Sequence, residues 1–136
     1  MTVLIRSLGH ASFQIKADRK IIYTDLKKYG KVVETSEIAD LILISHSHAD
    51  HCSAEIINKV RSKDTVVIAP KQSAAKIGGV VRTLRPNEEI TCGNIKVKAV
   101  EAFNYKRFRS LGKPWHPKGL SWLSNNGWEQ NDLSCW

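Results

Sequence analysis

Residues 41–51 read Leu-Ile-Leu-Ile-Ser-His-Ser-His-Ala-Asp-His, and this stretch is the most informative part of the chain. The apolar run 41–44 is typical of a buried strand. Four side chains of the kind that bind divalent cations lie directly after this run, where the end of a strand holds the backbone rigidly. They are His46, His48, Asp50 and His51. A histidine-rich surface loop without a metal is the alternative, but this spacing directly after a strand favours a metal site.

The sequence around this stretch predicts an α/β fold. Short apolar runs alternate with turn residues before it, and helical and strand patterns alternate after it. The expected strands are 3–6, 13–16, 21–24, 41–44, 65–69, 80–84, 90–92 and 95–99, and the expected helices are 54–61 and 72–77. Ser53 is a good N-cap for the first helix. This order is consistent with one αβ half of an αββα sandwich.

Length and composition describe one domain that can bury a core. The chain has 136 residues, of which 42% are hydrophobic. No run approaches the ~18 consecutive apolar residues of a membrane span, so no membrane partner is expected. The N-terminus lacks the apolar stretch of a signal peptide, which predicts a cytoplasmic location. The three cysteines are far apart and do not predict a disulfide framework, and Cys52 is expected to be a small buried residue rather than a ligand.

The net charge of +8 favours anionic partners. Residues 103–119 form an unusually long expected loop, which is usually functional or disordered. This loop carries His116 and four basic residues that we expect to contact substrate: Lys106, Arg107, Arg109 and Lys118. A small anionic or phosphorylated substrate is the expected partner. Nucleic acid, bound through the phosphate backbone, is the alternative.

Three motifs resemble the metallo-β-lactamase superfamily. They are the HxHxDH pattern within 39–53, the Gly-His-Ala-Ser-Phe segment 9–13 and the Trp-His-Pro-Lys-Gly segment 115–119. Together they resemble the superfamily's small zinc-dependent hydrolases, the branch that includes ascorbate-phosphate-lactonase-like proteins. The resemblance covers residues 1–120 and implies the N-terminal half of an αββα metallo-β-lactamase sandwich, which would be incomplete.

The resemblance also implies roles for the ligand-type residues. His46, His48 and His116 would bind a first metal, and Asp50 and His51 would bind a second. The metal would be zinc, as one or two ions, with one expected here and manganese or iron as alternatives. Metal-activated water would attack an ester, lactone or phosphoester, and Asp50 would orient this water and accept its proton.

Two further residues receive supporting roles in this interpretation. Asp25, at the end of the third expected strand, would support the metal loop rather than bind the metal. His10 lies in the first turn, where we expect a hydrogen-bonding structural residue, because the resemblance gives it no ligand role.

Residues 121–136 depart from the family pattern. The family continues with a strand and a His-Ala-Gly-Asp turn whose aspartate bridges two metals, and a last histidine follows later. Here the apolar periodicity ends, and three of the four tryptophans lie in these residues. One base out of register, permitted codons would encode the missing strand, so we interpret the tail as out of frame. Besides an impaired hydrolase, an inactive truncated metal-binding remnant and a basic nucleic-acid-binding module therefore remain alternatives.

Overall fold

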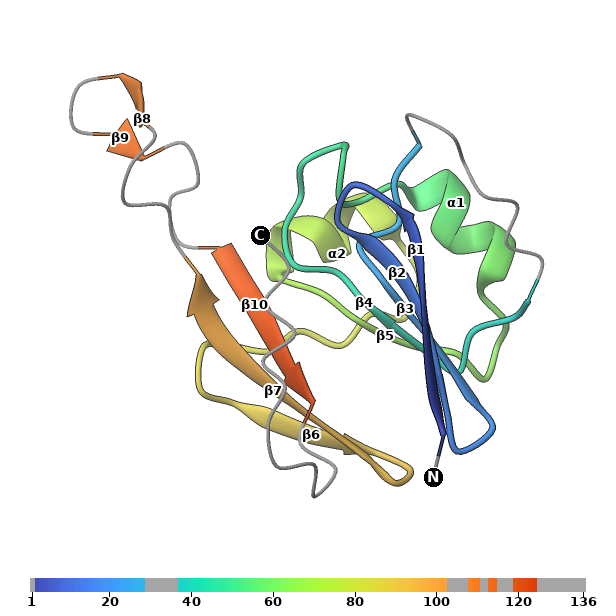
Figure 1. Cartoon of the computed structure of the whole chain (residues 1–136). Helices are drawn as coiled ribbons and strands as arrows, with labels where there is room; N and C mark the ends of the chain where they lie inside the picture. The colour runs from blue at the N-terminus through green and yellow to red at the C-terminus, as the bar shows by residue number, and fades with distance from the viewer. Residues whose placement is uncertain (1, 29–36, 103–107, 111–112, 115–118, 125–136) are drawn as a thin grey trace. The chain divides into compact units, whose positions relative to one another are not determined.

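The computed structural model of the chain describes residues 2–28, 37–102, 108–110, 113–114 and 119–124 (Figure 1). The backbone divides into two compact units, residues 1–84 and residues 85–135. Each unit has its own sheet, and each is described by itself below.

The first unit is built on a five-stranded mixed sheet with the order β1-β2-β3-β4-β5. The strands are β1 (Val3–Gly9), β2 (Ser12–Ala17), β3 (Lys20–Thr24), β4 (Leu41–Leu43) and β5 (Val66–Ile68). β1, β2 and β3 form the predicted antiparallel meander. β3, β4 and β5 are parallel to one another. Leu41, Ile42 and Leu43 are all buried, as a parallel strand covered on both faces requires.

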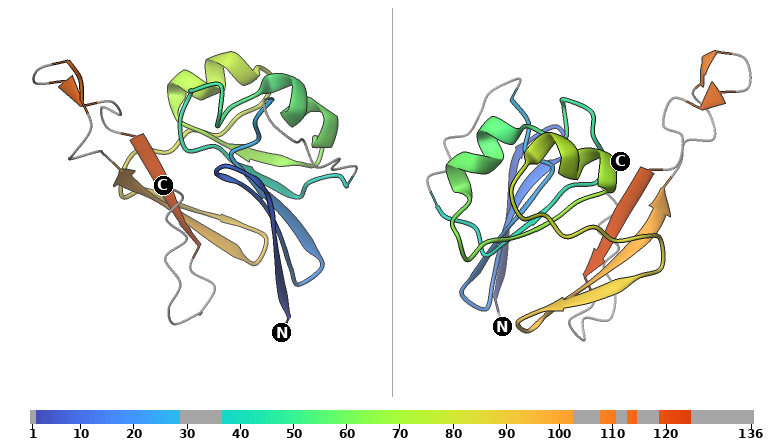
Figure 2. Two further views of the ribbon diagram at one scale, coloured as in Figure 1. Left: turned by 45° about the horizontal axis from the view of Figure 1, so that its top comes forward. Right: turned by 180° about the vertical axis from the view of Figure 1, so that it is seen from behind.

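Helices α1 (Ala54–Val60) and α2 (Lys71–Ile77) lie on the same face of this sheet, as Figure 2 shows from two directions. Ser53 caps α1, because its side chain accepts a hydrogen bond from the Ile56 amide. Ile57 of α1 is fully buried in the hydrophobic core with Ile42 and Val67 of the sheet. None of the described helices is long and apolar enough to cross a membrane.

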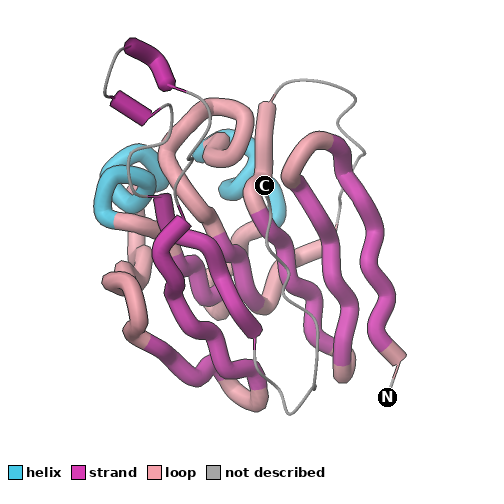
Figure 3. The backbone as a smooth tube through the Cα atoms, turned by 60° about the vertical axis from the view of Figure 1, so that its left-hand side comes forward, coloured by secondary structure: helices cyan, strands magenta, loops and turns pink. Residues whose placement is uncertain are grey.

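The second unit contains an antiparallel sheet with the order β10-β7-β6, whose strands are drawn in magenta in Figure 3. These strands are β6 (Glu89–Cys92), β7 (Ile95–Ala102) and β10 (Gly119–Ser124). Gly93, with φ of 63°, makes the predicted turn between β6 and β7, where a left-handed backbone favours glycine. A small separate hairpin pairs β8 (Phe108–Ser110) with β9 (Lys113–Pro114).

The α/β class and most predicted elements are confirmed, but two predictions are wrong. No strand forms over 80–84, where Arg82 makes only an isolated bridge to Ile68. The left-handed Gly78 and Gly79 bring the chain back toward β5 for a single pair, and Val80 stays 83% exposed. The expected loop 103–119 also contains β8 and β9.

The predicted tail begins inside a strand. Residues 121–124 complete β10, and their backbone pairs with β7 as far as the pair of Ser124 with Val97. Residues 125–136 lie outside the described part of the chain. The out-of-frame interpretation of the tail stays a prediction.

Candidate metal centre

Three chain segments meet at one edge of the five-stranded sheet. β3 and β4 run parallel, so their carboxyl ends, Asp25 and the loop after Leu43, lie side by side. β2 is antiparallel to β3, with Phe13 opposite Thr24, so the turn between β1 and β2 reaches the same edge. This turn carries His10. Sheet topology therefore gathers His10, Asp25 and the histidine loop.

The histidine loop is wound tightly on one carbonyl group. The backbone amides of His51 and Cys52 both donate to the His48 carbonyl, at 3.0 and 2.8 Å. The Ser53 amide donates to the Leu26 carbonyl at 2.8 Å, which ties the end of the loop to the segment after β3. The small side chains of Ser47 and Ala49 permit this tight winding.

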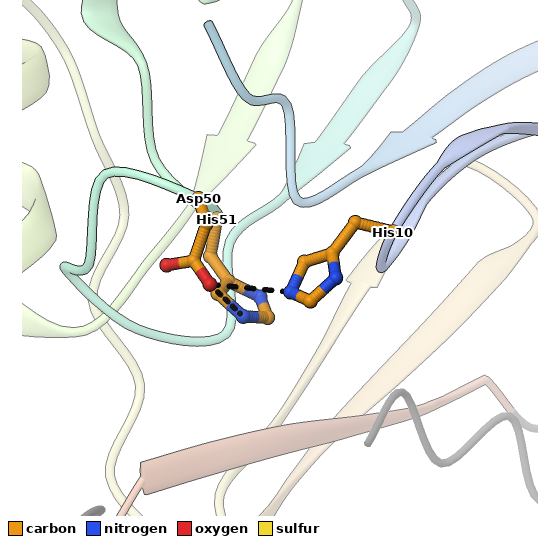
Figure 4. Close-up of side chains that lie close together, drawn as sticks. All are labelled: His10, Asp50 and His51. Carbon is orange, nitrogen blue, oxygen red and sulfur yellow. Dashed lines mark hydrogen bonds and ion pairs between the residues drawn. The ribbon is translucent and has the colours of Figure 1, made fainter. Parts of the chain in front are cut away.

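Two groups of metal-ligating side chains result, and Asp50 belongs to both. One group is His46, His48 and Asp50, and the other is His10, Asp50 and His51. Within each group the potential ligand atoms all lie within 4.8 Å of one another. Figure 4 shows the second group, with the Asp50 carboxylate pointing between the rings of His10 and His51. The predicted ligands His46, His48, Asp50 and His51 are thus brought together.

Asp25 holds the histidine loop in place through hydrogen bonds. It is 1% exposed, and its carboxylate accepts three hydrogen bonds. The Ser45 amide donates to Oδ1 at 2.7 Å, while Ser45 Oγ and His51 Nδ1 donate to Oδ2 at 2.6 and 2.9 Å. A buried carboxylate with three donors is well satisfied. Asp25 contacts the loop as the sequence interpretation expects for a supporting residue.

These contacts fix the tautomers of two histidines. A carboxylate can only accept, so Nδ1 of His51 carries the proton and Nε2 presents a lone pair. The single hydroxyl proton of Ser45 is directed to Asp25, so the 2.9 Å contact between Ser45 Oγ and His46 Nδ1 requires His46 to donate. Nε2 of His46 is then also the basic nitrogen. Both rings present the same atom for a metal.

The Asp50 carboxyl is kept ionised by its neighbours. Partial burial acts to raise its pKa, but the electrostatic influence of the His51 ring, a backbone hydrogen bond and the electrostatic influence of the His10 and His46 rings outweigh burial. The pKa of Asp50 therefore lies below its ordinary value. An ionised carboxylate among imidazoles is the state that a cation binds.

Cys52 does not join either group of ligating residues. It is 7% exposed and belongs to the hydrophobic core cluster. Burial raises the pKa of its thiol, and a thiol binds metal only when deprotonated. The structure agrees with the prediction of a small buried residue.

Other predicted site residues are not tested by the geometry. Lys106, Arg107, His116 and Lys118 lie outside the described residues. Arg109 lies in β8, where only the backbone is described. Sequence reasoning missed two contacts, those of Ser45 with Asp25 and of His10 with Asp50. For Ser45, the available signal was its position as a polar residue between the apolar strand and the first histidine of the loop.

The donor set fits a divalent transition metal. Neutral imidazole nitrogens and one carboxylate suit zinc, and they also suit iron. Two histidines with their Nε2 lone pairs fixed by hydrogen bonds meet the usual requirement that metal-binding histidines are held through the other ring nitrogen.

The chain is similar to two proteins that are named as hydrolases. A hydroxyacylglutathione hydrolase from Chelativorans sp. (strain BNC1) is 33% identical over 70 residues, which are 52% of this chain and 27% of that protein. A protein from Parabacteroides distasonis described as a metal-dependent hydrolase has a solved structure that is 27% identical, with a TM-score of 0.80. The similarity covers 92% of this chain and 57% of that one.

A third similarity shows the fold alone. The diiron β-hydroxylase CmlA from Streptomyces venezuelae is 18% identical, with a TM-score of 0.65 over 92% of this chain and 28% of that one. The chain thus spans little more than half the length of the Parabacteroides protein and less of the other two. The family model of the β-lactamase superfamily domain matches residues 4–131, a range that extends past Leu120. By this match and its structural neighbours, the chain belongs to the metallo-β-lactamase superfamily.

Proposed function

We propose that this chain is the metal-binding part of a hydrolase that uses a divalent cation to activate water against an ester, lactone or phosphoester. The observation that carries the proposal is the convergence of His46, His48, Asp50 and His51 at one sheet edge. Zinc is the proposed metal, because nitrogen and carboxylate ligands of this kind suit it. Manganese and iron are the other metals to test.

Each residue has a separate task in this proposal. His46 and His48 hold the first cation through imidazole nitrogens. Asp25 orients His51 directly and His46 through Ser45, so that each ring presents its Nε2 lone pair. A cation held by these residues would supply one kind of chemistry, the lowering of the pKa of bound water, so that a nucleophile forms near neutral pH. Asp50, ionised and partly exposed to solvent, orients the water and accepts its proton.

The proposed substrate is anionic, because the chain carries a net charge of +8. A positive field concentrates negatively charged esters around the protein and raises their association rate. The name of the Chelativorans relative supports including hydroxyacylglutathione among the substrates to be tested.

The test is a turnover assay on the purified 136-residue chain. The chain is loaded with zinc, manganese or iron and mixed with a phosphodiester, a phosphomonoester, a lactone and hydroxyacylglutathione. We expect hydrolysis of at least one substrate that a chelator abolishes. Asp50→Asn should lower the rate by about 10²- to 10⁴-fold, the range for loss of a general base.

Asp64→Asn is the matched control, since Asp64 is an exposed carboxylate outside both ligand groups. It should retain the rate of the unchanged protein. Failure of the chain to bind any of these metals, or turnover that persists after complete metal removal, would refute the proposed function, and metal binding without turnover would favour the truncated remnant.

A further inference from the structure

We propose that His10 is a ligand of a second cation, which it binds together with Asp50 and His51. The inference rests on the proposed function, because it assigns a second cation to the same centre. The HxHxDH pattern contains Asp50 and His51 but not His10, which lies 40 residues earlier. Among the described residues, His10 is the side chain that brings a third donor to this pair.

The distances between the donor atoms are those of a metal-ligand set. His10 Nε2 lies 3.1 Å from Asp50 Oδ2, and His51 Nε2 lies 3.5 Å from the same oxygen. Ligands at about 2.0–2.1 Å from a tetrahedral zinc ion stand roughly 3.3 Å apart. The two measured distances lie on either side of this value. A cation therefore fits between the three atoms with shifts of tenths of an ångström.

The chemical state of each donor is also suitable. Nδ1 of His51 donates to Asp25, so the nitrogen that faces Asp50 is the one with the lone pair. In the metal-free chain His10 Nε2 can hold Asp50 by donating a proton to it at 3.1 Å. A neutral imidazole can carry this proton on Nδ1 instead, which leaves Nε2 free to bind the cation.

The backbone conformation of the turn holds His10 in this position. Gly9 has φ of 97° and His10 has φ of 52°, and the pairing of β1 with β2 shifts register just before this turn. A non-glycine residue with positive φ is uncommon and costs energy. The turn directs the imidazole at Asp50, as Figure 4 shows. His10 is about half exposed, so the site is accessible to a cation from solvent.

The experiment is a Co²⁺ titration of the full chain and of His10→Asn, followed by absorption and by metal analysis. Asparagine tolerates the left-handed backbone but lacks the imidazole. We expect two cations per unchanged chain. In the variant the first should bind as before, and the second should bind at least about tenfold more weakly. Arg19→Asn is the control, because Arg19 is another exposed turn residue with positive φ, 62°.

Proton NMR of the Co²⁺-loaded chain separates a ligand from a residue that only holds Asp50. A ligand ring gives a strongly shifted Nδ1–H resonance, which should disappear in His10→Asn. Uptake of one cation only, or equal second-site affinity in both proteins, or absence of this resonance, would overturn the inference while leaving a one-metal hydrolase intact. Failure of the unchanged chain to bind any cation would overturn the proposed function as well.

Discussion

Replacing Asp25 by asparagine should weaken metal binding, although Asp25 is not one of the proposed ligands. The buried carboxylate accepts from the Ser45 amide through Oδ1, and from Ser45 Oγ and His51 Nδ1 through Oδ2. In Asp25→Asn the amide oxygen must face the Ser45 amide, which can only donate. The amide nitrogen then replaces Oδ2 and donates to both other groups. His51 must accept at Nδ1, and its remaining proton moves to Nε2.

The same reversal reaches the first candidate site. Ser45 Oγ, now an acceptor for the amide, can give its own proton to His46 Nδ1, at 2.9 Å. Both rings would then present a protonated Nε2 to the metal. Loss of such a supporting partner costs about 10–100-fold in metal affinity per ligand, or about 1.4–2.7 kcal/mol.

The fold should survive this substitution. Asparagine tolerates the positive φ of 46° at position 25. Exchanging a hydrogen bond to a charged group for a neutral one costs about 1 kcal/mol, so the three bonds of Asp25 together cost about 3 kcal/mol, against a typical stability of about 5–15 kcal/mol. A loss of affinity in a folded variant can therefore be separated from unfolding.

Zinc affinity is measured by competition with a chromophoric chelator, and long-range ¹⁵N–¹H NMR identifies the protonated nitrogen of each imidazole. Asp40→Asn is the matched control, because Asp40 is also hydrogen-bonded within the sheet but contacts Lys20 and the Ile21 amide instead. The reasoning fails if Asp25→Asn binds zinc as tightly as the unchanged chain and His51 keeps its proton on Nδ1.

Three more predictions concern the ligands of the first metal, the hydrophobic core and the carboxylate of Asp40. The double variant His46→Ala and His48→Ala should lose the first zinc, and an unchanged zinc content would contradict the assignment of these histidines as ligands. Ile57→Ala should lower the free energy of unfolding in urea by about 2–5 kcal/mol, because this side chain is fully buried; a cost below about 1 kcal/mol would contradict its place in the core. Burial acts to raise the pKa of Asp40, but hydrogen bonds from Lys20 and the Ile21 amide outweigh it, so this pKa lies below its ordinary value. Below about pH 4 the unfolded state therefore binds more protons than the folded state. The free energy of unfolding decreases as the pH falls through the pKa that Asp40 has in the folded state. Asp40→Asn should show less of this acid loss in urea titrations at pH 3 to 5, and an identical acid profile would contradict it.

The sequence could predict the core of this site because local patterns determine it. The apolar run 41–44 predicts a buried strand, and the ligand-type side chains directly after it had to lie at that strand's end. Ser53 as the N-cap of α1 is a signal of the same kind, since a cap bonds within one turn. Each of these predictions needs only the spacing between near neighbours.

The contacts that local spacing could not predict depend on strand register. His10 meets Asp50, and Ser45 meets Asp25, across gaps of 40 and 20 residues. The strand expected over 80–84 failed for a related reason. Its β-branched residues favour a strand, but the turn at Gly78 and Gly79 leaves it beside β5 for one residue pair only. Tertiary position overrides local propensity there.

Sheet register is what turns these spacings into a metal centre. Thr24 pairs with Leu43 in the parallel ladder and with Phe13 in the antiparallel one. Asp25 is therefore the first residue beyond the sheet on β3, level with the turn that holds His10 and with the start of the histidine loop. A slip of one residue between β3 and β4 would move Asp25 out of line with Ser45, whose amide and hydroxyl groups it binds. The apolar packing of the first unit thus fixes the register that brings Asp25 to the histidine loop, and the hydrogen bonds of Asp25 then determine which nitrogen His51 presents.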